Sequence, residues 1–211
     1  MECPVSMFCY QCEQTSRGKG CVEFGVCGKE VDVAVLQDLL VYQLEGIARL
    51  SEQALKQGKI IPSETHRLII DGLFSTLTNV NFDRSFFINF LRESQRVKSV
   101  LQNEPALIGA GHPATNLILP DDEGDILAVA AQVNIRPQAE PAADLQSLKD
   151  TLLYGLKGMA AYAHHAWVLG YQDEAVNLWF HKGLSALLDN TLGLEELVGL
   201  LMEFGQVNLK C

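Results

Sequence analysis

Four cysteines near the start of the chain have the residue type and the spacing of a metal–thiolate site. Cys9, Cys12, Cys21 and Cys27 form a Cys-x2-Cys-x8-Cys-x5-Cys pattern, and five of the six cysteines of the chain fall within its first 27 residues. Four thiolates brought together repel one another unless a metal ion or a metal cluster offsets their charge. In a reducing compartment such clustering indicates metal binding, because stable disulfides are rare there. The sequence therefore predicts that these four cysteines are metal ligands.

Two kinds of metal centre use four cysteines, and the spacing favours one of them. Structural zinc sites commonly have two close pairs of ligands, whereas five residues separate the second pair here. An iron–sulfur cluster is larger, and irregular spacings in a short glycine-rich loop suit it. The glycines of this loop are Gly18, Gly20, Gly25 and Gly28. Spacing alone favours iron–sulfur and leaves zinc as the second candidate; Cys3 and Cys211 lie outside the pattern and are expected not to be ligands.

A helical scaffold is expected to position this loop. After Val31, apolar residues recur at three- and four-residue intervals, which is typical of an amphipathic helix, and Gly58 is a stop signal. The same reasoning predicts further helices over residues 63–78, 84–103, 144–169, 172–188 and 194–204. No alternating segment rich in Val, Ile and Thr is present, so the predicted fold class is all-α.

Prolines divide these helices into two sets of three. Five prolines punctuate the stretch 104–143, which leaves room for one short helix near residues 125–132. The predicted regions are a Cys-rich cluster-binding loop (1–30), a first three-helix bundle (31–104), a linker with one short helix (105–143) and a second three-helix bundle (144–211). Because the last helix has no clear cap and no polar tail, the second bundle is expected to be truncated.

The charge balance excludes some classes of partner. The net charge is −10, the isoelectric point is about 4.9, and Lys and Arg are scattered. Nucleic-acid binding needs clustered Lys and Arg, so no nucleic-acid partner is expected. An acidic surface suits a basic electron-transfer partner, and it also serves solubility alone. No apolar run has the roughly 18–20 residues that span a bilayer, and the first ten residues lack the pattern of a signal peptide, so we expect no membrane partner and a cytoplasmic location.

Other residues with chemical potential are predicted to be structural. His164 and His165 are adjacent on a helix and point about 100° apart, so they cannot chelate one metal together, and His181 lies one helix later without a Glu-x-x-His partner motif. His66 and His112 have no ligand spacing. The residues 155–163 carry a small-residue face, which is expected to let a neighbouring helix or the cysteine loop approach closely.

Several segments resemble the opening of the hybrid cluster proteins, which are also called prismane proteins or hydroxylamine reductases. The resemblance begins with residues 7–15 (MFCYQCEQT), 20–21 (GC) and 25–29 (GVCGK), and continues through 36–40 (LQDLL), 73–83 (LFSTLTNVNFD) and 154–163 (YGLKGMAAYA). It runs in order from Met7 to the end of the chain. The chain is thus similar to the N-terminal domain of that family.

This resemblance implies a fold and a role. It implies a helical domain of two three-helix bundles, with a proximal cluster bound through Cys9, Cys12, Cys21 and Cys27. The spacing is similar to that of members with a [4Fe–4S] cluster rather than a [2Fe–2S] cluster. The implied role is electron relay from a redox donor protein toward a hybrid iron–sulfur–oxygen cluster in later domains. For the complete protein the resemblance implies reduction of hydroxylamine to ammonia, with nitric oxide as a competing substrate.

The chain departs from the family pattern at both ends. Residues 1–6 extend beyond the usual family start, and complete members are much longer, so the chain is expected to lack the hybrid cluster and its activity by itself. Three other roles stay open at this point: a free-standing electron carrier, a zinc-stabilised helical interaction module, and assembly with a separately encoded C-terminal part. In every iron–sulfur reading, Phe8, Tyr10 and Phe24 are expected to shield the cluster.

Overall fold

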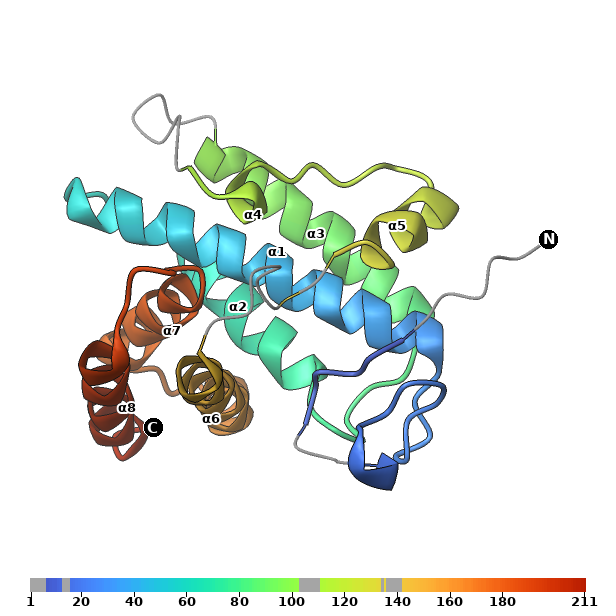
Figure 1. Cartoon of the computed structure of the whole chain (residues 1–211). Helices are drawn as coiled ribbons and strands as arrows, with labels where there is room; N and C mark the ends of the chain where they lie inside the picture. The colour runs from blue at the N-terminus through green and yellow to red at the C-terminus, as the bar shows by residue number, and fades with distance from the viewer. Residues whose placement is uncertain (1–6, 13–15, 103–110, 134, 136–141) are drawn as a thin grey trace.

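A computed structural model describes residues 7–12, 16–102, 111–133, 135 and 142–211. Apart from a short 3-10 turn, Ser16–Gly18, the regular elements of these residues are α-helices, and no strand occurs among them (Figure 1). The helices are α1 (Val31–Lys56), α2 (Ser63–Ser75), α3 (Arg84–Gln102), α4 (Pro113–Asn116), α5 (Glu123–Ala130), α6 (Ala143–Val168), α7 (Glu174–Leu187) and α8 (Leu194–Asn208). The predicted all-α class is confirmed.

Helix α1 is the central element of the fold. It contacts α3 on one side and α7 on another, and it also touches α2, α4 and α5 (Figure 1). The apolar stripe that predicted this helix is fully buried: it consists of Leu36, Leu39, Leu40, Leu44 and Ile47. Burying such a stripe on several partners supplies most of the stability of a helix of this kind.

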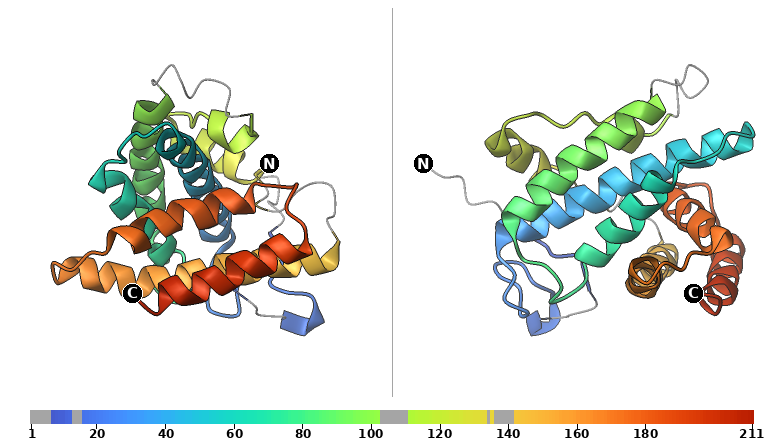
Figure 2. Two further views of the ribbon diagram at one scale, coloured as in Figure 1. Left: turned by 90° about the vertical axis from the view of Figure 1, so that its left-hand side faces the viewer. Right: turned by 180° about the vertical axis from the view of Figure 1, so that it is seen from behind.

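The helix contacts are consistent with the two expected sets of three, and a continuous core extends through both. Helices α1, α2 and α3 contact one another, as do α6, α7 and α8, while α1 packs on α7 and α2 packs on α6 (Figure 2). One cluster of buried apolar side chains extends through both sets. The arrangement is consistent with two three-helix bundles, and the domain boundaries given above stay a prediction.

The segment between the two sets contains two short helices rather than one. Besides α5, the four-residue α4 begins at Pro113, where the imidazole of His112 accepts a hydrogen bond from the Ala114 amide at 3.1 Å. Both short helices pack on α1. The sequence pattern missed α4 because one turn is too short to show periodicity.

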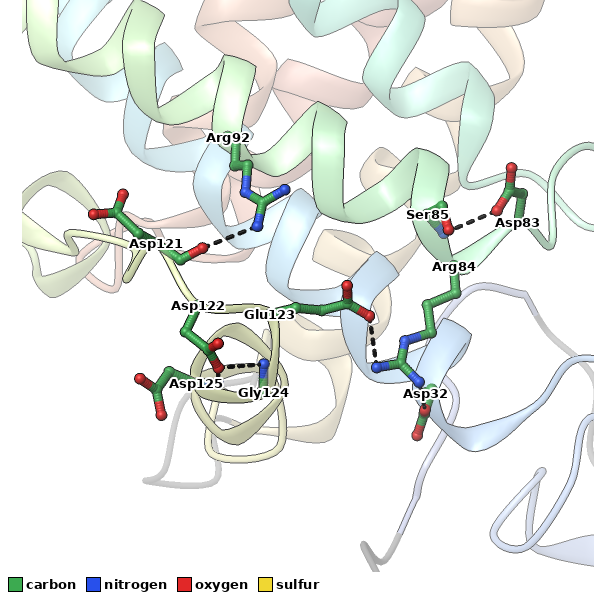
Figure 3. A network of polar contacts seen from close by, with 10 residues as sticks. All are labelled: Asp32, Asp83, Arg84, Ser85, Arg92, Asp121, Asp122, Glu123, Gly124 and Asp125. Atoms are coloured by element: carbon green, nitrogen blue, oxygen red, sulfur yellow. Dashed lines mark hydrogen bonds and ion pairs between the residues drawn. The ribbon is translucent and has the colours of Figure 1, made fainter.

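Acidic caps and one arginine fix the helix starts near the beginning of α1. Asp83 accepts from the Ser85 amide at 2.8 Å and caps α3. Asp122 caps α5 in the same way. The guanidinium of Arg84 lies 3.0 Å from Asp32 on α1 and 2.7 Å from Glu123 on α5, so one side chain ties three helices together (Figure 3).

Several helix ends differ from the predicted limits, and the largest difference is at α8, which continues to Asn208 instead of ending at residue 204. Helix α2 ends at Ser75 instead of residue 78, where the hydroxyls of Ser75 and Thr76 donate to the carbonyls of Gly72 and Leu73. Helix α7 begins at Glu174 instead of residue 172, because the Asp173 carboxylate accepts from the Val176 amide. Among the described residues, no helix is both long enough and apolar enough to cross a bilayer.

The small-residue face of α6 admits a neighbouring helix, as expected. A Cβ atom on Gly155 would lie 2.7 Å from the ring of Phe204 on α8, so the ring would have to move if this position carried a side chain. Ala160 and Ala163 on the same helix are buried. A Cβ on Gly158, by contrast, would meet no atom within 4 Å.

A buried histidine pair connects α2 to α7. His66 Nδ1 and His181 Nε2 lie 2.7 Å apart, and both rings are buried. Burial lowers the pKa of His181 to about 3, with His66 adding to the shift, and burial also lowers the pKa of His66. His181 Nδ1 has no hydrogen-bond partner within the described part of the chain. The pair is therefore a neutral contact that acid would break.

This pair predicts an acid-dependent loss of stability. An unfolded histidine takes up a proton near pH 6.5, whereas folded His181 stays neutral to about pH 3, so the free energy of unfolding falls as the pH decreases through that window. The variant His181→Gln cannot titrate at this position. For each unit by which the pH decreases, its free energy of unfolding should fall by up to about 1.4 kcal/mol less than that of the wild type. Urea unfolding between pH 7 and pH 4 measures this slope. Equal slopes for this variant and the wild type would contradict the prediction. The control variant is His165→Gln, which replaces an exposed histidine of α6.

A second prediction concerns the contact of α1 with α4. A Cβ on Gly46 would lie 2.3 Å from the carbonyl oxygen of Ala114, and backbone cannot give way as a flexible side chain can. Gly46→Ala should therefore reduce the free energy of unfolding by about 1–3 kcal/mol. The matched variant Gly158→Ala fills open space and should raise it by about 1 kcal/mol through helix propensity. Denaturant titration of both variants tests the pair, and a neutral or stabilising Gly46→Ala would refute the close contact.

Candidate functional site

The cysteine loop lies at the N-terminal end of α1. The loop between α2 and α3 runs beside it, and helix α6 passes nearby (Figures 1 and 2). The cysteines of the described residues are all free thiols. Cys3 lies outside the described residues. Cys211 lies apart from the loop, in a hollow lined by α6 and α7, where its sulfur is 3.8 Å from the carbonyl oxygen of Met159.

Backbone hydrogen bonds shape the loop around its sulfur atoms. The Cys9 amide donates to the Cys21 carbonyl at 3.0 Å, which brings the first and third predicted ligands together. The Val26 amide donates to the sulfur of Cys21 at 3.5 Å. Cys27 lies on a tight turn closed by bonds between Gly25 and Lys29 and between Gly28 and Gly25. Amide donors to sulfur are a recognised way to stabilise thiolate charge in iron–sulfur sites.

One glycine of the loop is required by sterics. Gly20 has a φ of +104°, which side-chain-bearing residues rarely adopt, and a Cβ there would lie 2.9 Å from the Phe8 ring. The Phe8 ring also packs against Tyr10, with centroids 4.7 Å apart. Two of the three aromatic residues expected to shield the site, Phe8 and Phe24, are 40% and 57% exposed.

A buried lysine places positive charge beside the first cysteine. Lys29 is 1% exposed, and its ammonium lies 3.9 Å from the sulfur of Cys9. The same ammonium donates to Gln37 of α1 and lies 5.9 Å from the ring centroid of Phe82. Burial raises the pKa of the Cys9 thiol, and Lys29 opposes that rise. The loop therefore presents an ammonium where an anionic thiolate would form.

Gln11, between Cys9 and Cys12, anchors the loop to two helices. Its side-chain nitrogen donates to the Asp38 carboxylate on α1, and its side-chain oxygen accepts from the Lys157 ammonium on α6. All three side chains are buried. The phenol of Tyr154 also donates to the Tyr10 carbonyl at 3.4 Å. The interval between the first two ligands is thus fixed from outside the loop.

Burial shifts the pKa values of this charged group strongly. It raises the pKa of Asp38 to about 7 against the opposing effect of Lys157. It also raises the pKa of Glu45, which lies two turns further along α1, to about 8. It lowers the pKa of Lys157 to about 7, while Asp38 acts in the opposite direction. Perturbed groups of this kind gather at functional sites more often than elsewhere.

Sequence reasoning missed this polar group. Gln11, Asp38 and Lys157 all lie within the segments that carry the family resemblance, yet each belongs to a different segment. A lysine within the otherwise small and apolar face of α6 was the available signal, since a charged residue there must find a buried partner.

The remaining histidines occupy structural positions. His164 lies 2.8 Å from the Asp71 carboxylate and stacks on the ring of Phe74, while His165 meets the same ring edge-on. Across the residues that the structure describes, no group of three or more His, Cys, Asp or Glu side chains is arranged to hold a metal ion. The assignment of the four loop cysteines as ligands accordingly stays a prediction.

The donor set nevertheless fits an iron–sulfur cluster chemically. Four free thiols share one loop, one of them accepts an amide hydrogen bond, and an ammonium lies beside another. Cys9, Cys12, Cys21 and Cys27 would be the residues that hold the cluster. Soft thiolate ligands select zinc, copper or iron–sulfur clusters over hard cations.

The fold and the loop together define an all-helical domain that carries an N-terminal thiol-rich site. The chain matches the Prismane/CO dehydrogenase family over residues 7–211. The chain therefore belongs to that family.

Curated relatives agree with this membership. The chain is 42% identical over 206 residues to a hydroxylamine reductase of Thermoanaerobacter pseudethanolicus, an alignment that covers 96% of this chain and 37% of the relative. A hydroxylamine reductase of Desulfitobacterium hafniense (strain Y51) gives the same values, and one of Solidesulfovibrio magneticus is 41% identical over 206 residues, covering 97% of this chain and 38% of its own length. The chain thus spans less than two fifths of these relatives.

The ligand assignment predicts a simple mutational pattern. Replacing Cys9, Cys12, Cys21 or Cys27 singly with Ala should abolish or strongly reduce iron bound per chain, because a cluster that loses one of four thiolates loses an iron ligand. Cys211→Ala should retain the wild-type content. Iron assay of anaerobically purified variants measures this, with circular dichroism to verify that the helices persist. Full iron content in any one of the four loop variants would remove that cysteine from the ligand set.

Proposed function

We propose that Cys9, Cys12, Cys21 and Cys27 hold a [4Fe–4S] cluster and that the chain relays electrons through it. The observation that carries the proposal is the loop itself: four free thiols, with the Val26 amide directed at one sulfur and a buried ammonium beside another. Membership of the Prismane/CO dehydrogenase family supports the same assignment.

The residues of the chain supply binding and electrostatics. The cluster, when bound, supplies reversible one-electron storage. Lys29 and the Val26 amide offset the negative charge of the thiolates. Gln11 holds the interval between the first two ligands rigid through its two buried contacts. A rigid ligand set lowers the reorganisation that accompanies electron transfer.

Electrons would enter from a separate redox donor protein. Val22, Phe24 and Val26 of the cysteine loop are exposed apolar residues, and Glu23 and Glu30 beside them are exposed acids. Exposed acids of this kind, on a chain of net charge −10, suit a basic donor that is steered electrostatically. A cytoplasmic location, where free thiols persist, belongs to the same proposal.

The destination of the electrons would lie in a longer protein. The relatives are named hydroxylamine reductases, and this chain spans 37% of the first of them. We propose that the domain passes electrons inward to a hybrid cluster held by C-terminal domains or by a separately encoded part. Reduction of hydroxylamine there consumes two electrons and two protons and yields ammonia and water, with nitric oxide as a second substrate. A relay of single electrons would serve that reaction by successive transfers.

Metal and acid-labile sulfide analysis of the anaerobically purified chain tests the proposal. We expect about four irons and four sulfides per chain, with a brown absorption band that dithionite bleaches. Two irons and two sulfides would replace the [4Fe–4S] assignment with [2Fe–2S] and keep the relay. One zinc without sulfide would instead contradict electron transfer and identify a zinc-stabilised interaction module.

A turnover assay separates the relay domain from a free-standing reductase. The reduced chain should be reoxidised by mediators without sustained consumption of hydroxylamine, because none of the predicted ligands belongs to a hybrid cluster. Sustained ammonia production by the chain alone would contradict the relay role.

A further inference from the structure

We propose that two buried charged side chains, Lys157 and Asp38, set the reduction potential of the cluster held by the cysteine loop. Both bind the side-chain amide of Gln11, which lies between the ligands Cys9 and Cys12. The inference rests on the proposed function, because it concerns the cluster proposed there. It gives opposite effects to the two residues: Lys157 raises the potential and Asp38 lowers it.

Lys157 is the buried cation of this arrangement. It lies in the middle of α6, its side chain is 0% exposed, and its ammonium donates to Gln11. An ammonium without solvent is costly unless negative charge lies close to it. Asp38, and after it Cys9 and Cys12, favour the charged form of Lys157 electrostatically, whereas Lys29 opposes it. Thiolates of a bound cluster would strengthen that effect, so Lys157 is placed as their counter-charge.

The carboxylates near Lys157 share this role. Asp38 and Glu45 both lie on α1 and are buried, and burial keeps the pKa of each far above its usual range. The ammonium of Lys157 opposes that rise in both carboxylates and favours their ionised forms. Asp38 is the first of the anions that favour the charged form of Lys157, and the thiolates of a bound cluster would add to its effect.

Charge near a redox centre acts on its potential with a predictable sign. Adding an electron makes the centre more negative, which a nearby cation favours and a nearby anion opposes. Low local dielectric strengthens both effects because water does not screen them. Lys157 and Asp38 both bind the side-chain amide of Gln11. If their variants acted only by loosening the loop, both would shift the potential in the same direction. An electrostatic effect instead shifts it in opposite directions.

The same helix offers a matched control. Lys149 lies two turns before Lys157 on α6 and is also buried, but its ammonium donates to the carbonyls of Leu187 and Asp189 at 2.9 Å, at the end of α7. The cysteines are not among the groups that shift its pKa. Lys149→Gln thus removes the same charge from the same helix, farther from the loop.

Redox titration of the cluster-loaded chain at pH 7 tests the inference, with iron and sulfide assays on every variant. Lys157→Gln keeps a hydrogen-bond donor and removes the charge; it should decrease the ratio of reduced to oxidised cluster at fixed potential at least tenfold, which is a 59 mV decrease for one electron. Asp38→Asn should shift the ratio in the opposite direction. Lys157→Arg, which keeps the charge, should stay near the wild type, and Lys149→Gln should shift the ratio much less than Lys157→Gln.

Each outcome decides the matter. Opposite shifts for the Lys157 and Asp38 variants with unchanged iron content support the inference. Unchanged potentials, shifts of the same sign, or an equal shift from Lys149→Gln would overturn it and leave a structural role. If Lys157→Gln does not fold, Asp38→Asn alone must raise the potential or the inference fails. Absence of iron and sulfide from the wild type would refute the proposed function instead.

Discussion

The contact between Gln11 and two oppositely charged side chains is the constraint on which the cysteine loop depends. The loop itself is short, rich in glycine and joined internally by few backbone hydrogen bonds. Its rigid neighbours are α1 and α6, which present Asp38 and Lys157 from opposite sides of one amide. Because all of these groups are buried, removing one leaves the others without compensation. Fold and site are therefore joined by polar contacts that neither helix could satisfy alone.

This constraint also explains why both sets of helices matter to the site. Asp38 lies on α1, the central helix of the first set, and Lys157 lies on α6 of the second set. The packing of α1 on α7 and of α2 on α6 keeps the two sets together through one apolar core. The interval between Cys9 and Cys12 consequently depends on residues as far as 146 positions away from Gln11.

Much of the scaffold was predictable from the sequence, whereas the support of the site was not. The long helices were predictable because stripes such as Leu36 and Leu40 follow helical periodicity and are fully buried. The turn α4 lacks enough residues to show a period, so it was missed. The pairing of His66 with His181, and of Gln11 with Lys157, depends on tertiary packing between segments that no local pattern relates. The cysteine spacing identified a candidate ligand set, yet it contained no sign of the cations beside it.

Iron-57 Mössbauer spectroscopy of the anaerobically purified chain tests the central claim most directly, because it reports the coordination and oxidation state of each iron. The account predicts one cluster of about four tetrahedral, sulfur-ligated irons that takes up a single electron from dithionite. Isolated iron sites that do not share the added electron, or a chain whose bound metal is zinc, would contradict it.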